Sequence, residues 1–160
     1  MEVKNLRMSK IVRISANLLY TFVIIFGLYI ILHGHLTPGG GFQGGAVVAT
    51  GVALVLVAFS YEDILAMLKK VTYTAQESAG LVLFIGTALL AMGLGVTFFY
   101  NYLANSGSLF GMSVPFGPNP GELDTAGVIP IMNIAVGIEV WGGLALIVFY
   151  MLSGIARERV

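Results

Sequence analysis

The sequence predicts an all-α membrane protein with four transmembrane helices, and two observations lead to that fold class. Of the 160 residues, 58% are hydrophobic and only 10% are charged, whereas soluble domains carry about 25% charged residues. In addition, four apolar segments each approach or exceed the roughly 20 residues that cross a hydrocarbon core: 14–32, 42–60, 79–100 and 131–153. Lipid offers no hydrogen-bond partners, so a crossing segment must satisfy its own backbone groups, which favours helices. We treat 1–160 as a single transmembrane domain.

Composition also excludes several classes of chemistry. The chain contains no cysteine, which rules out disulfides, iron–sulfur ligation and thiol catalysis. Its formal net charge is zero, so the charge balance gives no indication of nucleic acid as a partner. We therefore expect no cofactor and no bound metal in this chain, and any redox chemistry would take place on a partner protein.

The first apolar segment, 14–32, is expected to remain in the mature protein as a helix. Basic residues precede it, as they do in a secretory signal peptide. Its apolar core is longer than the about 7–15 residues typical of such peptides, however, and no small-x-small cleavage site follows it. The segment is therefore interpreted as a spanning helix.

The stretch HGHLTPGGGFQGG, residues 33–45, is predicted to form a tight turn between the first two helices. Pro38 stops the first helix, and the glycines after it can adopt positive φ at no steric cost. Gly39, Gly41 and Gly44 also match the G-x-G-x-x-G dinucleotide fingerprint. That fingerprint has meaning only between a strand and a helix of a soluble βαβ unit, and here a spanning helix precedes it, so a nucleotide site is not expected.

The two histidines of this stretch are His33 and His35. Two histidines separated by one residue, with no cysteine and no nearby carboxylate, form a poor metal site. We favour the interpretation that they are polar anchors at the level of the lipid headgroups.

The second segment, 42–60, carries a ridge of small residues. Gly41, Gly45, Ala49 and Ala53 recur every four residues, and such a ridge lets another helix approach closely in a membrane. Gln43 adds a polar group near the start of this helix, where exposed amide groups and the positive end of the helix dipole also lie. The spacing alone does not decide whether this end of the helix meets an ion.

Polar sequence flanks the third segment, 79–100, on both sides. The stretch YEDILAMLKKVTYTAQES precedes it, and residues 101–130, rich in glycine, proline, asparagine and serine, follow it as a predicted loop. Glu122 and Asp124 are the only charged residues on that side of the four-helix arrangement. They could concentrate cations at an entrance or keep the loop solvated, and the second interpretation is the simpler one.

The fourth segment, 131–153, contains Glu139, the only ionisable residue within the four predicted spans. It is the ninth residue of that segment, ~12 Å from its start at the helical rise per residue. A carboxylate at this depth costs roughly 2.5 kcal/mol or more to insert, so it should face a partner or a water-filled path. Gly142 and Gly143 lie nearby on the helix surface and leave room for a close helix.

Two interpretations of Glu139 stay open. It can handle protons or cations, or it can be a protonated acid that hydrogen-bonds to a neighbour for packing alone. Asn17 and Asn133, the other strongly polar residues in or beside the spans, are interpreted as packing residues.

The distribution of positive charge predicts the orientation. All eight lysine and arginine residues fall on the same side of a four-helix arrangement: Lys4, Arg7, Lys10, Arg13, Lys69, Lys70, Arg157 and Arg159. Positively charged loops face the cytoplasm, so both termini of this multi-pass cell-membrane protein are expected there.

Two blocks of the sequence carry a family resemblance. HGHLTPGGGFQGG resembles the signature of the MnhB family, the B-type subunits of Mrp-type multisubunit Na+/H+ antiporters, and GELDTAGVIPIMNIAVGIEVWGGL is similar to the second block of that family. With the four-helix arrangement, the resemblance covers nearly the whole chain. The positions that match the first motif are His35, Pro38, Gly39, Gly40, Gly41, Phe42, Gln43, Gly44 and Gly45.

The resemblance implies a small, non-redox subunit inside a large membrane assembly, whose bigger subunits are related to the antiporter-like subunits of respiratory complex I. Similar subunits occur in archaeal membrane-bound hydrogenases and sulfane-sulfur reductases, where a peripheral electron-transfer arm drives the ion module. The partners expected on this basis are other membrane subunits, possible peripheral arms of these kinds, the lipid bilayer, Na+ and H+.

The leading hypothesis is a subunit that lines or braces a Na+ or H+ path, with Glu139, His35, Gln43 and Asp124 as its candidate residues. The alternative is a purely structural scaffold that meets no ion. An intramembrane enzyme has no support, because no Ser/His/Asp grouping lies at a common depth, so the chain is not expected to be an enzyme by itself. The kind of parent complex stays open.

The orientation can be tested with a reporter that is active only in the cytoplasm. Fused after Val160, the reporter should be active, and inserted near Ser113 it should be silent, because the positive charges hold both termini in the cytoplasm. The reverse pattern would contradict the orientation drawn from lysine and arginine.

Overall fold

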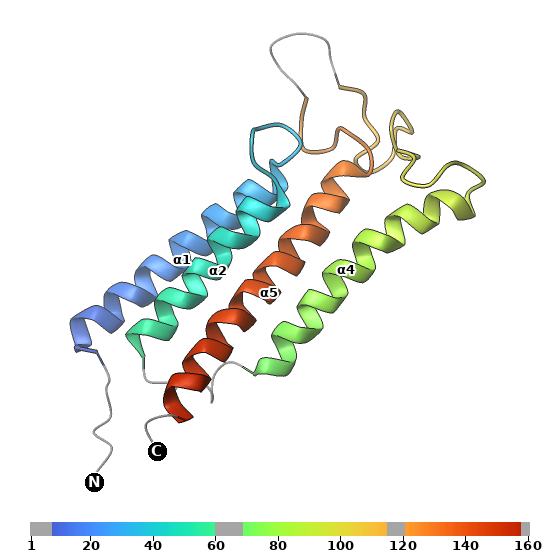
Figure 1. Cartoon of the computed structure of the whole chain (residues 1–160). Helices are drawn as coiled ribbons and strands as arrows, with labels where there is room; N and C mark the ends of the chain where they lie inside the picture. Colours follow the sequence, from blue (N-terminus) through green and yellow to red (C-terminus); the bar gives the residue numbers. More distant parts are fainter. Residues whose placement is uncertain (1–7, 60–68, 115–120, 158–160) are drawn as a thin grey trace.

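A computed structural model of the chain describes residues 8–59, 69–114 and 121–157, and Figure 1 shows a bundle of long helices. The helices are α1 (Lys10–Leu32), α2 (Gly41–Ala58), α4 (Lys70–Gly93) and α5 (Ile129–Arg157). Within these described residues, four helices are long and apolar enough to cross a membrane, which confirms the predicted all-α membrane fold.

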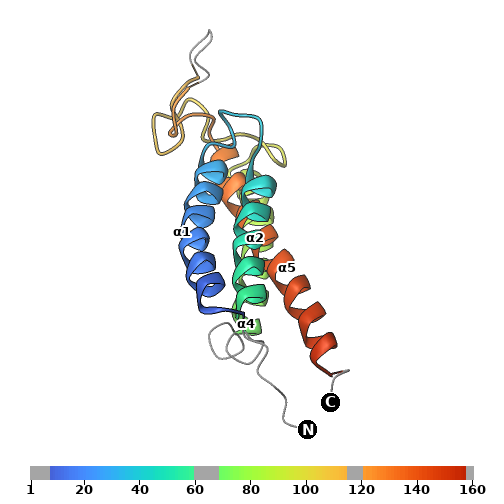
Figure 2. The same ribbon diagram turned by 90° about the vertical axis from the view of Figure 1, so that its left-hand side faces the viewer.

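The helices pack in the order α1, α2, α5, α4, so the last helix in the sequence lies inside the row (Figure 1). In the view of Figure 2, α1 and α2 lie in front of α4, and the C-terminal part of α5 leaves the row. Residues 33–40, 94–114 and 121–128 connect the helices at one end of the bundle (Figure 1). The first residues of α1 and α4 lie at the opposite end.

The turn of residues 33–40 joins α1 to α2, and the two helices pack against each other. Gly39 has a φ of +116°, a conformation that glycine adopts without strain. The amide of Gly40 donates a 2.9 Å hydrogen bond to Oε1 of Gln43, which satisfies one of the exposed amide groups at the start of α2.

The bounds of α4 differ from the predicted segment, 79–100. The helix already begins at Lys70, because the stretch KVTYTAQES contains no glycine or proline that would break it. Apolarity therefore marked only part of the helix, and residues 70–78 belong to it as well. This change brings Glu77 into a spanning helix.

The end of α4 is set by a glycine. Gly95 has a φ of +81°, and its amide donates to the carbonyl of Met92. The amide of Val96 donates to the carbonyl of Ala91, which completes a Schellman motif. The helix therefore ends at Gly93, and residues 94–100, the last part of the predicted span, lie outside it.

Glycines bring α2 close to both of its neighbours. A Cβ atom on Gly45 would lie 2.7 Å from the carbonyl oxygen of Gly137 on α5. On another face of α2, a Cβ atom on Gly44 would lie 2.7 Å from the carbonyl oxygen of Gly27 on α1. Since real Cβ atoms do not approach a backbone this closely, larger residues at these positions would push the helices apart.

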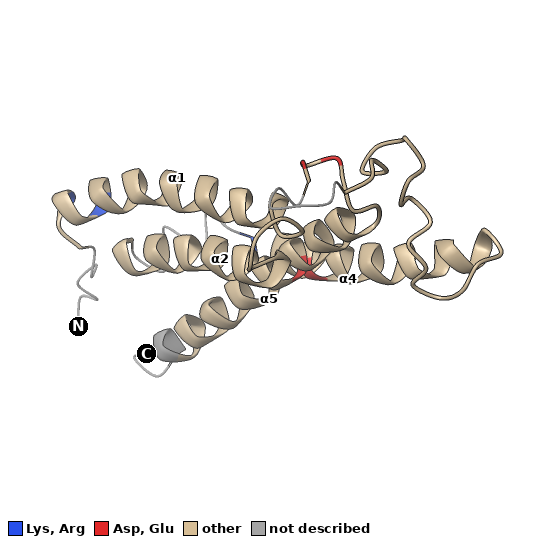
Figure 3. Cartoon of the chain, turned by 90° about the horizontal axis from the view of Figure 1, so that it is seen from above, with Lys and Arg blue, Asp and Glu red and all other residues tan. Residues whose placement is uncertain are grey.

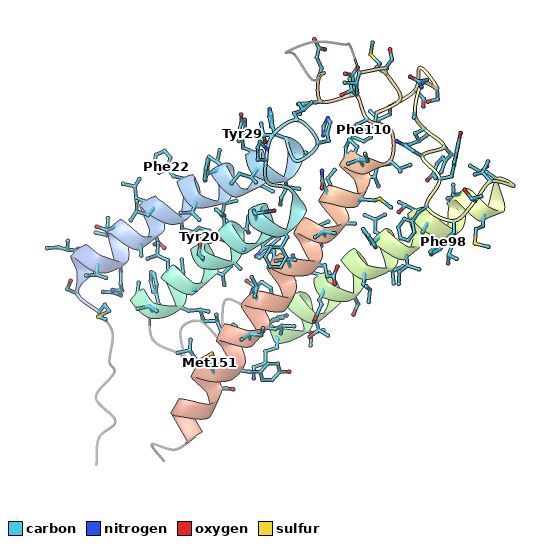
Figure 4. The ribbon with its side chains drawn as sticks, turned by 45° about the horizontal axis from the view of Figure 1, so that its top comes forward. Tyr20, Phe22, Tyr29, Phe98, Phe110 and Met151 are labelled. Atoms are coloured by element: carbon cyan, nitrogen blue, oxygen red, sulfur yellow. The ribbon has the colours of Figure 1, made fainter. Side chains whose placement is uncertain are left out.

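The apolar core lies among α2, α4 and α5, away from the connecting loops. Its buried members are Val52, Leu56, Tyr73, Ala145, Leu146 and Phe149. By contrast, α1 and α4 expose large apolar side chains, such as Phe22 and Val82. Figure 4 shows Phe22 projecting away from the bundle. These outer surfaces suit contact with lipid or with neighbouring proteins.

The described basic residues at the helix starts lie at one end of the bundle: Lys10, Arg13, Lys69 and Lys70 (Figure 1). Other residues that enter the sequence predictions lie outside the described residues: Lys4, Arg7, Arg159 and residue 60, the expected end of the second span. Which side of the membrane the basic end faces stays a prediction.

Gly41→Leu tests the close packing of α2 against α5. A Cβ atom on Gly41 would meet the backbone carbonyl of Asn133 and lie 2.9 Å from Cβ of Val136. Overpacking of this kind should lower the free energy of unfolding by about 1–3 kcal/mol or more, with loss of assembled complex and of transport in parallel. The measurements are thermal unfolding of the purified protein in detergent, a native gel and ion flux.

The matched control is Gly86→Leu on α4, since nothing lies within 4 Å of a Cβ atom at Gly86. It should leave the unfolding temperature of the isolated chain nearly unchanged. Equal stability of the two variants would show that the α2–α5 packing described here is wrong.

Candidate functional site

Glu139 lies on α5 at its contact with α4. It is the eleventh residue of α5, which puts it roughly 15 Å from the start of that helix. A Cβ atom on Gly80 of α4 would lie 2.6 Å from the amide nitrogen of Glu139 and 2.8 Å from its Cβ atom. The two helices therefore touch through their backbones here, and the Glu139 side chain is half-buried beside the contact.

A second carboxylate, Glu77, lies at the same contact on α4. A Cβ atom on Gly142 would lie 2.8 Å from the amide nitrogen of Glu77, and one on Gly143 would lie 3.5 Å from its Oε1. Glu77 is exposed and is the eighth residue of α4. Gly142 thus provides room for the backbone of α4, and Glu77 is the group that comes closest to Gly143.

The two carboxylates lie on the same side of the α4–α5 contact. Gly143 follows Glu139 by four residues, so the two positions are neighbours on one face of α5. Because Gly143 faces the carboxylate of Glu77, Glu77 and Glu139 lie about one helical turn apart along this contact. Figure 3 shows acidic positions on the ribbon where α4 and α5 cross.

Sequence reasoning missed Glu77 because it placed the start of the third span at residue 79. The absence of a helix breaker between Lys70 and Gly80 could have indicated that the helix begins before residue 79. Within the four described helices, Glu77 and Glu139 are the only acidic residues.

Two sides of α5 contact different helices, α2 and α4. Its residues Asn133, Gly137 and Trp141 are spaced four apart and face α2 at the positions of Gly41 and Gly45. Ala135, Glu139 and Gly142 face α4. Gln43 of α2 and Glu139 are therefore separated by α5, and the structure does not bring these two candidate residues together.

The residues of the glycine motif lie mostly at helix contacts near the loop end. Gly41, Gly44 and Gly45 are buried, as is Ala49 further along the same ridge, whereas Ala53 is half-buried. Gly40 lies near the Asn133 side chain, since a Cβ atom there would be 3.0 Å from its Oδ1. Pro38 and Phe42 of the motif are exposed.

His35 connects the glycine-rich turn to the loop before α5. Its Nε2 lies 3.0 Å from the carbonyl oxygen of Glu122, so the imidazole can donate a hydrogen bond there. His33, in contrast, makes its contacts within its own helix: its Nδ1 lies 3.1 Å from the carbonyl of Tyr29, and its ring stacks on that tyrosine. Of the two histidines, His35 is thus the one that joins separate segments.

The loop itself is held by backbone contacts and by one asparagine. The carbonyl of Asp124 accepts a hydrogen bond from the amide of Met112 at 3.2 Å. Asn101 donates to the carbonyl of Ala126 at 3.1 Å and accepts from the amide of Val128 at 2.8 Å. Asn101 therefore fixes the chain just before α5, a role that its position in a glycine-rich stretch did not signal.

The candidate residues consequently form two separate groups. His35, Gln43 and Asp124 lie at the loop end, and Glu139 lies at the α4–α5 contact. Among the described residues, no three histidine, aspartate or glutamate side chains come together in a way that could hold a metal ion. The chemistry available at the α4–α5 contact is that of carboxylates, which can take up a proton or attract a cation.

Comparison with known proteins gives a consistent family. Residues 11–157 match the model of a domain related to the MnhB subunit of Na+/H+ antiporter. The chain is 32% identical over 142 residues to an uncharacterised protein of Methanocaldococcus jannaschii, a match that covers 88% of this chain and 51% of that protein. It is 30% identical over 88 residues to the B-type subunit of the Na+/H+ antiporter of Bacillus subtilis, covering 55% of this chain and 61% of the relative.

A solved structure is also similar. It is that of the membrane-bound sulfane sulfur reductase, an archaeal respiratory membrane complex, and the match has a TM-score of 0.68 at 32% identity. The match covers 95% of this chain and 63% of the other. The aligned regions thus span between half and two thirds of the length of these similar proteins.

Proposed function

Because the chain belongs to the family of the MnhB subunit of Na+/H+ antiporters, we propose that it is a non-redox membrane subunit of a multisubunit Na+/H+ antiporter module. In this role it contributes to cation or proton translocation and to assembly of the complex. It is not an enzyme by itself. Its partners are the other membrane subunits of the module. The chain lies in the cell membrane, and both of its termini face the cytoplasm.

The position of Glu139 is the observation that carries the transport role. A carboxylate roughly 15 Å along a spanning helix costs about 2.5 kcal/mol or more to place there, so its presence calls for a function. No hydrogen bond or ion pair satisfies its side chain within the described part of the chain. The carboxylate therefore stays available to exchange a proton or to attract Na+.

The packing around Glu139 supports the same role. Its backbone is fixed against Gly80, so the carboxylate is held on a rigid helix pair and not on a loop. The fixed position keeps the Glu139 carboxylate in place to bind a cation or a proton.

The loop end has a different role in this proposal. Gln43 caps α2, and His35 bonds to the carbonyl of Glu122, so both side chains stabilise the turn and the loop. Asp124 lies in the same loop and can raise the local concentration of cations at the entrance. The glycine motif then serves assembly, because it fixes α2 between α1 and α5.

A second candidate is the same kind of subunit in a respiratory complex. The observation in its favour is the similarity to a chain of the membrane-bound sulfane sulfur reductase over 95% of this sequence. Purification of the complex from its native membrane distinguishes the two candidates. A co-purifying hydrogenase-like or sulfur-reductase arm supports the respiratory complex, whereas membrane subunits alone support a stand-alone antiporter.

Glu139→Gln tests the transport role directly. Glutamine keeps the size and hydrogen-bonding capacity of the side chain but removes its ability to exchange a proton or hold Na+. We expect normal assembly and a fall in Na+-dependent flux of about tenfold or more, whereas Glu139→Asp keeps part of the activity. The measurement is Na+ and proton flux in vesicles that contain equal amounts of assembled complex.

Unimpaired flux through the glutamine variant, across a range of pH and Na+ concentration, would contradict the transport role. Glu139 would then be a packing residue, and the chain would be a structural scaffold.

A further inference from the structure

One side of the α4–α5 contact forms an outward surface that carries a charge. We call it the Glu77 face, and it consists of Thr74, Glu77 and Leu81 on α4 with Gly143 and Ile147 on α5. Thr74 and Leu81 are spaced three and four residues from Glu77, and Ile147 follows Gly143 by four, so each set shares one helix face. All of these residues are exposed except Gly143, which is half-buried.

The carboxylate of Glu77 has no partner within the described part of the chain. The basic residue of α4, Lys70, is two turns away, and its Nζ lies 4.7 Å from the ring centroid of Tyr150 and 5.8 Å from that of Phe149. This cation–π contact keeps the ammonium group near the rings of α5. Glu139, about one helical turn away, is also a carboxylate and cannot neutralise Glu77.

The depth of Glu77 makes lipid an unfavourable environment for this face. Glu77 is the eighth residue of α4, about 10 Å from its start. It lies beside Gly142 and Gly143, which are near the middle of the apolar stretch Ile129–Gly154 of α5. An exposed carboxylate at this level would lie against hydrocarbon, so another group must cover it.

We propose that the Glu77 face binds a transmembrane helix of a neighbouring subunit, and that this helix presents a lysine or arginine to Glu77. A basic side chain supplies the charge that the face lacks. Gly143 has no side chain, which permits a close backbone approach, and Leu81 and Ile147 offer apolar contacts on either side. The inference rests on the proposed function in one respect, namely that the chain works inside a multisubunit complex.

A second copy of this chain fits the face less well than a basic helix does. A two-fold contact through this face would be self-complementary and would bring two Glu77 carboxylates toward each other. Like charges placed together in a membrane disfavour such a pair. The charge of the face therefore selects a different subunit.

Photo-crosslinking in the assembled complex tests the position of the partner. A benzophenone amino acid replaces Leu81, and the control places it at Val82, the next residue, which is 70% exposed and points to a different side of α4. From position 81 we expect a crosslink to a span of another subunit that contains lysine or arginine. Crosslinks to lipid alone, to a second copy, or to a span without a basic residue would overturn the proposal.

A charge exchange tests the pairing itself. Glu77→Lys should reduce the amount of the crosslinked subunit that co-purifies by about tenfold, because it places two positive charges together. Replacing the partner's basic residue with glutamate in the same complex should restore most of the loss. Unchanged co-purification of the Glu77→Lys variant, or no recovery in the exchanged pair, would overturn the proposal.

Glu77→Gln separates docking from ion binding. Docking predicts weakened co-purification with an unchanged Na+ dependence of flux in the complex that remains. A shifted Na+ dependence with intact assembly would mean that the face holds a cation instead, and the proposal would fall. The flux of the Glu139→Gln variant is measured independently, so unimpaired flux there overturns the transport role while a successful charge exchange still supports the docking face.

Discussion

The close backbone approach of α5 to its two neighbours is the constraint on which the rest of the structure depends. Gly45 on α2 and Gly80 on α4 each leave no space for a Cβ atom against the backbone of α5. In a membrane the hydrophobic effect does not hold helices together, so van der Waals contact at such positions has to do so. The small residues of this chain therefore decide which helix lies inside the row.

Because of this packing, two sides of α5 contact different helices. The side of Asn133 and Gly137 fixes α2 and, through it, the glycine-rich turn and the loop end. The side of Glu139 holds α4, whose Glu77 lies on the same flank. A carboxylate on a rigid helix pair keeps its position when a proton or an ion binds, as the proposed transport role of Glu139 requires.

The sequence allowed the fold class to be predicted because apolar length and turn chemistry are local properties. Apolarity placed the start of α4 wrongly, since threonine, glutamine and glutamate make a helix less apolar without breaking it. The end of α4 was also placed wrongly, at residue 100, since the segment after Gly95 is still apolar although Gly95, at positive φ, ends the helix. In the loop, Phe110 and Ala126 have φ of +64° and +72°, conformations that their residue types do not signal. Which neighbour Glu139 faces depends on tertiary packing and lay beyond the sequence.

The central claim is that the contact of α4 with α5 holds Glu139 in position for transport, and Gly80→Ala tests it most directly. The added Cβ atom would lie 2.6 Å from the carbonyl oxygen of Ala135 and from the amide of Glu139, so the two helices must separate. Flux per assembled complex should fall by about tenfold or more, because a displacement of ~1 Å is enough to misplace a working group. Gly86→Ala, on the same helix in open space, should keep full flux. Undiminished flux in the Gly80→Ala variant would contradict the account.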